Sequence, residues 1–286
     1  MKVLVLGATG MAGHTIAIYF KEKGHEVVSF SRTPFIYCNN IIGDVLDIDQ
    51  IKEVILKGQF NAVINCIGIL NQDAEKNPSL AVYLNSYLPH LIANIIKDTS
   101  TKLIHMSTDC VFRGNTGPYF ENSFCDGETF YDRTKALGEV LDKKNLTFRN
   151  SIIGPDIDSK GIGLFNWFLQ QKVRVNGFTG AIWTGVTTLT LAKAMEKAIE
   201  DNLCGLYNLV NNKNISKYDL LHLFNKYFNE NEIIIEKQDS FKLDKTLRNT
   251  REDFLFVIPS YEQMISEMKD WVDTHPNLYA HYKVEK

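Results

Sequence analysis

Three glycines at intervals of three residues follow the first apolar segment and constrain the fold more than any other feature. The segment is residues 3–6, a β-branched run typical of a strand buried on both faces, and a helical apolar pattern follows as far as Lys23-Gly24. Glycine permits a tight turn and a close approach of the backbone to a pyrophosphate, and the N-terminus of the next helix favours an anion. The pattern predicts a dinucleotide-binding loop with Gly7, Thr9, Gly10, Met11 and Gly13 as contacts.

Strand-like and helix-like segments alternate along the first half of the chain. The pattern predicts further strands at 26–30, 40–43, 62–65, 102–106 and 147–150, and helices at 47–56, 78–97 and 131–143. This alternation is typical of an α/β fold with a doubly wound parallel sheet, the Rossmann arrangement. Right-handed crossovers place the C-terminal ends of the strands on one edge, where ligands bind.

Beyond residue 153 the rhythm loosens. Glycine and proline predict breaks at 154–155, 161–163 and 176–180, between helices expected at 164–172, 189–200, 216–228 and 260–272 and a strand at 233–235. We expect residues 1–153 to form the dinucleotide-binding domain, completed by a strand and a helix within about 178–210. Residues 154–286 are expected to form mainly a smaller C-terminal substrate-binding lobe.

The end of the second strand distinguishes between the two nicotinamide cofactors. Enzymes that bind NAD usually have Asp or Glu there to hold the ribose 2′-hydroxyl. This chain has Ser31, Arg32 and Thr33 instead. A guanidinium and two hydroxyls suit a 2′-phosphate, which favours NADP over NAD. In the alternative interpretation, Arg32 is a solvated loop cation.

Two further strand ends carry candidate cofactor contacts. Asp44 and Val45 follow the third strand, where a carboxylate can accept a hydrogen bond from the adenine amine. Cys66, Ile67 and Gly68 follow the fourth strand, and the glycine lets the backbone pass beside the cofactor. We expect all five residues to lie at the same sheet edge as the glycine loop.

A tyrosine and a lysine four residues apart form a candidate catalytic pair. Tyr131 and Lys135 lie on one face of a predicted helix. A free tyrosine has a pKa of about 10, and we expect the ammonium of Lys135, with a positive nicotinamide ring nearby, to lower that pKa. Ser107-Thr108-Asp109 directly follow the fifth strand. A hydroxyl there and the phenol would be two donors that converge on a developing alkoxide.

These motifs resemble those of a known family. The glycine loop, Ser107-Thr108-Asp109-Cys110-Val111-Phe112 and Tyr131-Asp132-Arg133-Thr134-Lys135-Ala136-Leu137-Gly138-Glu139 are similar to those of the dTDP-4-dehydrorhamnose reductase family of extended short-chain dehydrogenases. The resemblance covers residues 1–153. It implies that NADPH reduces the keto group, at C4, of a nucleotide-linked 6-deoxy sugar, in deoxysugar biosynthesis for cell-surface polysaccharide.

The resemblance also implies roles for single residues. Tyr131 is the general acid, Thr108 donates a second hydrogen bond, and Lys135 holds the cofactor ribose. Asn85 matches a helix asparagine that supports the lysine, with a polar residue on an exposed helix face as the alternative. Ser107 is expected at the cofactor and Asp109 at the substrate. Cys110 replaces an aromatic residue of the family, so the sugar need not be 4-keto-rhamnose.

Candidate substrate contacts follow the sixth strand. The resemblance places Asn150 and Ile152 at the cofactor and Ser151 at the substrate. Trp183 is expected to stack on a sugar or a base, with a core tryptophan as the alternative. A basic run with a spacing of three predicts one helix face that clamps the substrate diphosphate, chiefly through Lys245 and Arg248, or else a solvated face. The run consists of Lys242, Lys245, Arg248 and Arg251.

Composition and charge argue against several classes. The net charge of −3 provides no field that attracts nucleic acid or an anionic membrane. The apolar start ends at Gly7, short of a signal peptide or a membrane span. Five scattered cysteines without a C-x-x-C pair predict reduced thiols in a cytoplasmic protein and no metal site. The habit of the family implies a homodimer.

Other functions of the same fold stay open. A sugar 4,6-dehydratase is expected to carry Asp-Glu after the threonine, whereas Asp109 precedes Cys110 here. A 4-epimerase usually holds NAD, which the missing acid after strand two disfavours. A non-catalytic NADP-binding regulatory subunit is the third alternative, since that of methionine adenosyltransferase resembles the same family. The intact Thr108, Tyr131 and Lys135 favour a reductase.

Overall fold

A parallel sheet forms the larger part of the molecule. Within residues 1–282, which the computed structural model describes, seven strands pair in the order β10-β6-β5-β4-β1-β2-β3. The order reverses between β1 and β4, the switch point at which such sheets bind ligands. The predicted doubly wound Rossmann sheet is confirmed. The strands are β1 Lys2–Leu6, β2 Glu26–Ser31, β3 Asn39–Ile42, β4 Ala62–Asn65, β5 Lys102–Ser107, β6 Leu146–Arg149 and β10 Gly205–Asn208.

Helices cover both faces of this sheet. On one face α1 (Met11–Glu22) packs against α8 (Thr188–Glu200), and on the other α2 (Ile48–Gly58) packs against α5 (Leu88–Ile95). The core beneath α1 and α8 continues into the second half of the chain, where it includes Phe165, Phe224 and Trp271. The two halves therefore share one hydrophobic core.

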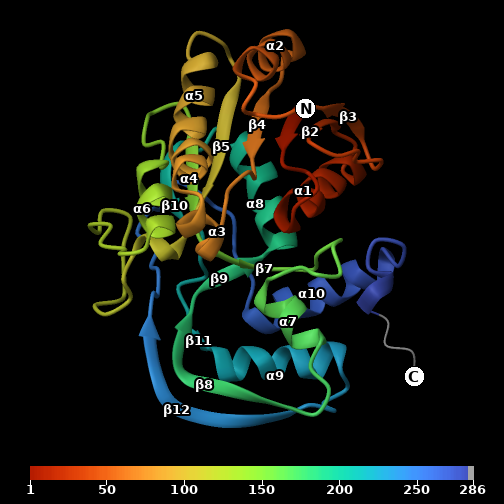
Figure 1. The fold of residues 1–286 in the computed structure, drawn as a ribbon, viewed down its shortest axis with the longest axis vertical. Coiled ribbons are helices and arrows are strands. Elements are labelled where there is room, and N and C mark those ends of the chain that lie inside the picture. Colours follow the sequence, from red (N-terminus) through yellow and green to blue (C-terminus); the bar gives the residue numbers. More distant parts are fainter. Residues whose placement is uncertain (283–286) are drawn as a thin grey trace.

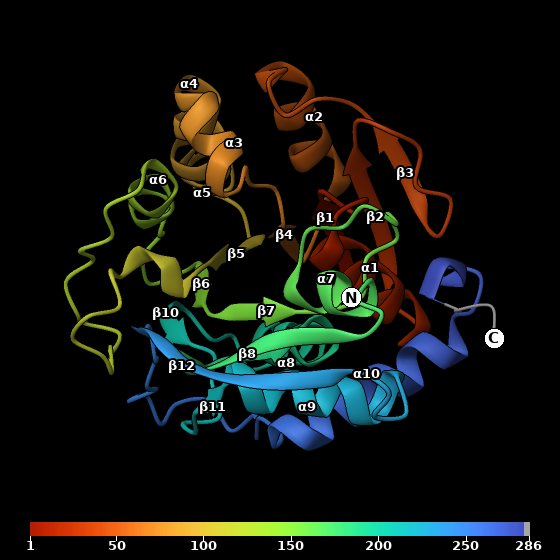
Figure 2. The ribbon, with the colours of Figure 1, turned by 60° about the horizontal axis from the view of Figure 1, so that its bottom comes forward.

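The smaller lobe lies below the carboxyl edge of the sheet in Figure 1. Its strands β8 (Arg174–Trp183) and β12 (Ile234–Asp244) run side by side as a long curved ribbon next to α9 (Lys217–Phe228), which Figure 2 shows from another side. The predicted break at 176–180 is wrong, because Gly177 lies inside β8. A Cβ on Gly177 would lie 2.6 Å from the Tyr218 ring, so glycine is needed for close packing.

The lobe contains further short elements. They are β7 Ser151–Ile153, which pairs with β9 Gly185–Thr187, β11 Ile215–Ser216, α7 Leu164–Leu169 and α10 Tyr261–Thr274. None of the helices between residues 1 and 282 is both long and apolar enough to cross a membrane. In the same range, no three His, Cys, Asp or Glu side chains gather in a way that could hold a metal ion.

The predicted helix at 78–97 contains an irregular turn. It consists of α4 (Pro78–Ala81), a π-helical turn (Val82–Tyr87) and α5, and the short helix α3 (Asn71–Lys76) precedes it. Single π-helical turns occur frequently at functional sites. Here the turn carries Asn85, whose side chain is fully buried.

Candidate active site

The glycine loop closes tightly on itself between β1 and α1. Gly7 has a φ of +79°, which favours glycine, and its carbonyl oxygen accepts from the Gly10 N–H at 3.1 Å. A Cβ on Gly13 would lie only 2.1 Å from that same oxygen. A side chain at position 13 would therefore force the loop open. The cradle and the N-terminus of α1 fit the phosphates of a dinucleotide.

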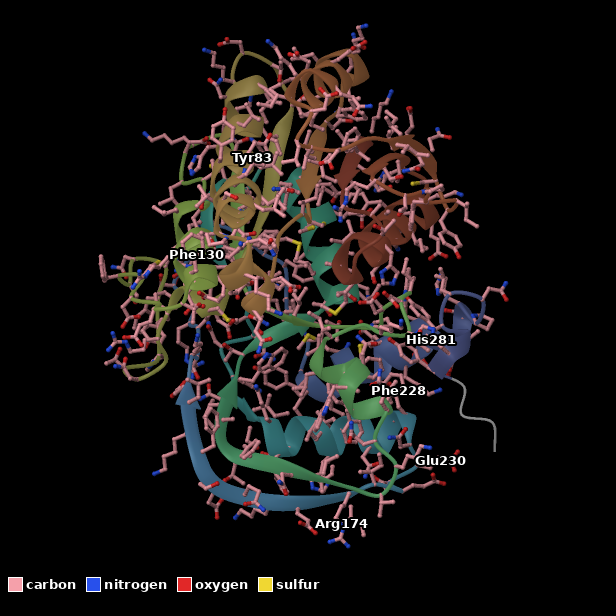
Figure 3. The ribbon with its side chains drawn as sticks, in the orientation of Figure 1. Tyr83, Phe130, Arg174, Phe228, Glu230 and His281 are labelled. Atoms are coloured by element: carbon pink, nitrogen blue, oxygen red, sulfur yellow. The ribbon has the colours of Figure 1, made fainter. Side chains whose placement is uncertain are left out.

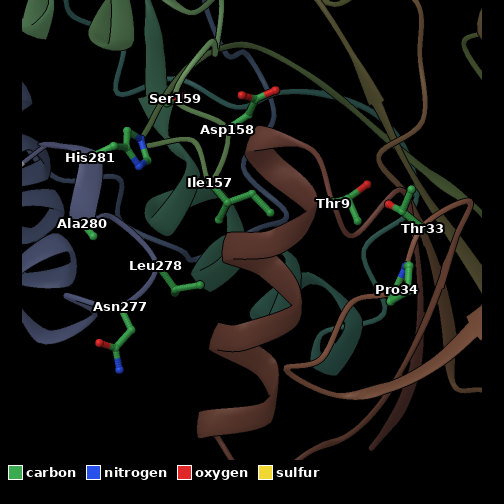
Figure 4. A pocket seen from close by; sticks show the side chains of 10 residues that line it. All are labelled: Thr9, Thr33, Pro34, Ile157, Asp158, Ser159, Asn277, Leu278, Ala280 and His281. Carbon is green, nitrogen blue, oxygen red and sulfur yellow. The ribbon is translucent and has the colours of Figure 1, made fainter.

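A cavity of about 660 Å³ lies beside this loop (Figure 4). Thr9 and the Thr33-Pro34 segment after β2 line one side, and residues 157–159 and 277–281 of the smaller lobe line the other. The residue after the second strand normally meets the adenosine ribose, so this cavity is adjacent to the expected 2′-phosphate position.

The residues after β2 have different roles. The buried Ser31 hydroxyl donates to the Thr33 carbonyl at 2.7 Å and accepts from Asn40 Nδ2 at 2.9 Å, so it shapes the turn. The Arg32 side chain is exposed and forms no hydrogen bond or ion pair with any residue from 1 to 282. Arg32 is therefore the available cation at this strand end.

The ends of β3 and β4 lie at the same edge as the loop. Asp44 accepts from the Leu46 N–H at 3.0 Å, and the Val45 carbonyl accepts from the Tyr83 hydroxyl at 2.8 Å (Figure 3). A Cβ on Gly7 would meet Ile67 Cγ1 at 3.0 Å, so the segment of Cys66, Ile67 and Gly68 touches the glycine loop. Burial raises the pKa of the Cys66 thiol to about 12, which keeps it neutral.

Tyr131 is positioned by a capped helix. Thr129 and Asp132 form a capping box that begins α6 (Phe130–Leu137), so Tyr131 stands in its first turn. The phenol is 7% exposed and lies close enough to Thr108, which follows β5, for that hydroxyl to affect its pKa, while the Thr108 hydroxyl donates to Asp109 at 3.1 Å. Burial raises the pKa of Tyr131 above its usual value, and the nearby Thr108 hydroxyl opposes this only in part. The phenol is therefore protonated at neutral pH.

The interaction between Lys135 and Tyr131 differs from the expected one. The buried ammonium of Lys135 donates to the Met106 carbonyl at 2.6 Å, and burial lowers its pKa to about 8, opposed by Glu139 and Cys66. Lys135 is not among the groups that shift the pKa of Tyr131, which burial raises. The expected lowering by Lys135 together with a nicotinamide ring stays a prediction. Lys135 instead joins α6 to the end of β5, and a protonated phenol is the form that a general acid requires.

The sequence reasoning missed a buried ion pair next to the candidate catalytic residues. Arg149 donates to both carboxylate oxygens of Glu139, at 2.8 and 2.6 Å, and the Ser107 hydroxyl donates to Glu139 at 2.6 Å. Both charged side chains are almost completely buried. The pair joins the ends of β5, α6 and β6, so Ser107 supports the site through Glu139. The available signal was that Glu139 lies one helical turn after Lys135.

Two buried asparagines flank the site. Asn85 accepts from the Ile69 N–H at 2.9 Å and donates to the Ile69 carbonyl at 2.9 Å and to Thr134 at 3.1 Å. It therefore orders the segment after β4 against α6, and the alternative of an exposed helix position is wrong. Asn150, 2% exposed, has no hydrogen-bond partner for either amide atom among the described residues. A buried amide without partners suits a position that meets a ligand.

One residue of the basic run reaches the site. Lys245 is an electrostatic neighbour of the buried Asp109 and of Cys110, which themselves lie beside Tyr131. Lys217, the first residue of α9, is a second cation near Asp109 that the sequence reasoning missed. Burial raises the pKa of Asp109, and the charges of the two lysines offset this rise only in part.

The predicted basic helix face is wrong. Lys242 lies on β12, because this strand pairs with β8 as far as Asp244. The chain after Asp244 is irregular and forms no helix before α10. Arg248 bonds to Asn214 at 2.5 Å, and Arg251 pairs with Asp253 and with the carbonyls of residues 204 and 206. Arg248 thus holds the segment before α9, and Arg251 joins its own segment to the edge strand β10 of the parallel sheet.

Trp183 occupies the core. It is 6% exposed, packs against the Tyr261 ring at 5.6 Å and donates its indole N–H to Ser151 at 2.9 Å. This placement agrees with the alternative of a core tryptophan. Ser151 and Ile152 lie on β7 and are only partly buried.

Known proteins resemble the chain in sequence and in fold. Residues 1–153 match the family described as the RmlD substrate binding domain. The probable low-salt glycan biosynthesis reductase Agl14 of Haloferax volcanii is 32% identical over 143 residues, 49% of this chain and 48% of that protein. The chain therefore spans about half the length of this relative. The methionine adenosyltransferase 2 subunit beta of Xenopus laevis is 25% identical over 237 residues, 77% of this chain and 70% of that protein.

A solved structure shares the fold over nearly the whole chain. The dTDP-4-dehydrorhamnose reductase of Bacillus anthracis, crystallised in complex with NADP, superposes with a TM-score of 0.79. At 19% identity it covers 96% of this chain and 99% of its own, and it demonstrates the fold. The match over residues 1–153 exceeds half of the 286 residues. The chain belongs to the family of the RmlD substrate binding domain.

Proposed function

We propose that the protein is a cytoplasmic, NADPH-dependent reductase of the keto group, at C4, of a nucleotide-linked 6-deoxy sugar, acting in deoxysugar biosynthesis for cell-surface polysaccharide. The observation that carries this proposal is the pair of hydroxyl donors, Thr108 and a protonated Tyr131, at the carboxyl edge of the sheet near the switch point. Two donors at one point stabilise the negative charge that develops on a carbonyl oxygen during reduction.

The residues at this edge fit a dinucleotide. The glycine cradle would hold its phosphates, and Arg32 its 2′-phosphate. Asn85 would order the segment after β4, and the buried amide of Asn150 would contact the nicotinamide half. NADPH, when bound, supplies the hydride. The NADP complex of the Bacillus anthracis reductase supports this choice of cofactor.

The protein's own residues carry out the remaining steps. Thr108 and Tyr131 orient the carbonyl oxygen, and the phenol then transfers its proton to that oxygen. Lys135 keeps α6 against β5 through the Met106 carbonyl. Lys245 and Lys217 are near enough to lower the pKa of Asp109 and would attract the substrate's diphosphate.

Turnover is the direct test. Purified protein is mixed with NADPH and a panel of dTDP-, UDP- and GDP-linked 4-keto-6-deoxy sugars, and the loss of NADPH absorbance is followed. We expect one nucleotide sugar to be reduced. Tight NADPH binding without turnover on the whole panel would contradict the proposed reaction.

Arg32→Ala is expected to raise the KM for NADPH about tenfold and leave the KM for NADH nearly unchanged, because a charge-assisted hydrogen bond is lost. Steady-state kinetics with both cofactors measures this. Arg174→Ala is the matched control, since that exposed arginine pairs with Glu236 at the far end of the smaller lobe (Figure 3). Equal losses with NADPH and NADH would remove Arg32 from the 2′-phosphate site.

A non-catalytic subunit is the second candidate. The alignment with the Xenopus laevis subunit extends over 77% of this chain, further than the alignment with the Haloferax reductase. This function predicts NADPH binding without reduction of any nucleotide sugar, and saturable binding to a methionine adenosyltransferase catalytic subunit. The turnover assay above separates the two candidates.

A further inference from the structure

The last described segment of the chain crosses the dinucleotide-binding half. Residues 275–282, here named the C-terminal strap, follow α10 and end in a 3-10 turn (Ala280–Tyr282). Figure 4 shows Asn277, Leu278, Ala280 and His281 on one side of α1, with Thr9 and Thr33 on the other side. All of them line the cavity beside the glycine loop, so two ends of the sequence form its walls.

A chain of hydrogen bonds joins the strap to the glycine loop. The Trp271 indole N–H donates to the Tyr279 hydroxyl at 2.9 Å, and that hydroxyl donates to His14 Nε2 at 2.8 Å. His14 Nδ1 then donates to the carbonyl of Gly10, the middle glycine of the loop, at 2.9 Å. All three side chains are buried. Tyr279 and His14 are 265 residues apart in the sequence.

The state of His14 sets the direction of these bonds. Burial lowers the pKa of His14 to about 4, so the imidazole is neutral at physiological pH. A neutral imidazole has one donor and one acceptor nitrogen. Since Nδ1 faces a carbonyl and must donate, Nε2 must accept. Its short partner is the Tyr279 hydroxyl at 2.8 Å, which therefore donates, and the Thr15 hydroxyl lies farther away at 3.4 Å.

Further contacts hold the strap along α1. His275 lies 2.8 Å from Glu22 at the last turn of α1, and the Tyr282 hydroxyl accepts from the Asp156 N–H at 2.7 Å. The segment that starts at Asp156 also reaches the loop, because a Cβ on Gly163 would lie 3.2 Å from Met11 Sδ. The strap and this segment together cover the N-terminal end of α1.

We propose that the C-terminal strap is part of the cofactor site: it forms the outer wall for the phosphate-bearing adenosine end of the dinucleotide, and the Trp271–Tyr279–His14 chain holds the glycine loop in its binding conformation. This inference rests on the proposed dinucleotide function. Binding of the dinucleotide and docking of the strap stabilise each other, as linkage requires. The exposed His281 imidazole lies on this wall as a donor for the anionic ligand.

Hydrogen exchange tests the wall without any substitution. The full chain is exchanged with and without saturating NADPH, and peptides covering 275–282 and 7–15 are followed by mass spectrometry. Both regions are expected to exchange at least about fivefold more slowly with NADPH. Protection of 7–15 without protection of 275–282 would overturn the inference and leave the proposed function intact.

Tyr279→Phe tests the hydrogen-bond chain. It keeps the ring but removes the short bond to His14 Nε2 and leaves only the longer contact with Thr15 at 3.4 Å. The Kd for NADPH, measured by fluorescence titration, is expected to rise about tenfold. Tyr19→Phe is the matched control on α1, because the Tyr19 hydroxyl donates to Glu196 at 2.6 Å, on the side facing α8. The Kd of this variant for NADPH is expected to stay within about twofold of the wild-type value. Circular dichroism confirms that both variants fold.

The outcomes separate the inference from the function it rests on. Wild-type affinity in Tyr279→Phe, with wild type binding NADPH, would overturn the role of the chain. Equal loss in both variants would do the same, because it would indicate a general effect on α1. If wild type binds neither NADPH nor NADH, the proposed function fails and the inference fails with it.

Discussion

Replacing Tyr131 with Phe is expected to lower kcat for the reduction about a thousandfold while the Kd for NADPH stays within about twofold. In the proposed reaction the phenol gives a proton to the carbonyl oxygen, and its raised pKa keeps that proton in place at neutral pH. Phe keeps the ring among its apolar neighbours Ala74, Ala81 and Phe130, so the fold is preserved. Single-turnover kinetics and fluorescence titration measure the two quantities separately.

The control is Tyr87→Phe on the neighbouring π-helical turn, where the residue is 46% exposed. It is expected to keep kcat within about twofold. Thr108→Val is expected to lose about a hundredfold in kcat, because one of the two donors to the developing alkoxide remains. If Tyr131→Phe kept a tenth or more of the wild-type kcat, another group would be the acid and the assignment would fall.

Replacing Glu139 with Gln is expected to lower the free energy of unfolding by about 3–5 kcal/mol, because it leaves the Arg149 guanidinium buried without a counter-charge. The guanidinium is held on two sides, by the carboxylate and by the Phe112 ring 5.0 Å away, so it has little freedom to reach water. Chemical denaturation at neutral pH measures the change. Because Ser107 also bonds to Glu139, the end of β5 loses a contact in the same variant.

Two further variants make this result specific. Glu53→Gln removes an exposed partner of Lys57 and is expected to cost less than about 1 kcal/mol. The double variant Glu139→Leu with Arg149→Met is expected to regain most of the loss, because a buried pair replaced by apolar groups leaves no unpaired charge. A cost below about 1 kcal/mol for Glu139→Gln would show that water reaches the guanidinium.

The sequence sufficed to predict the parts of the site that lie close together along the chain. Gly7, Gly10 and Gly13 specify their own conformation, since the constraint is a turn of seven residues followed by a helix. The spacing of Tyr131 and Lys135 needs only one helical turn, and Thr129 and Asp132 begin that helix locally. The alternation of strands and helices predicted the parallel sheet, because crossovers between neighbouring parallel strands have one favourable hand.

The tertiary structure alone decided what depends on contacts between distant segments. The spacing of Lys242, Lys245 and Arg248 fits a helix as well as an extended or irregular chain. Only the pairing with β8 selects the extended form of Lys242. The pKa of Tyr131 depends on how deeply it is buried, which no spacing of residues states. The bond between Tyr279 and His14 joins the two ends of the chain, and it exists because the smaller lobe and α1 share one hydrophobic core. Burial and long-range pairing are sums over the whole fold, whereas a motif describes only its own neighbourhood.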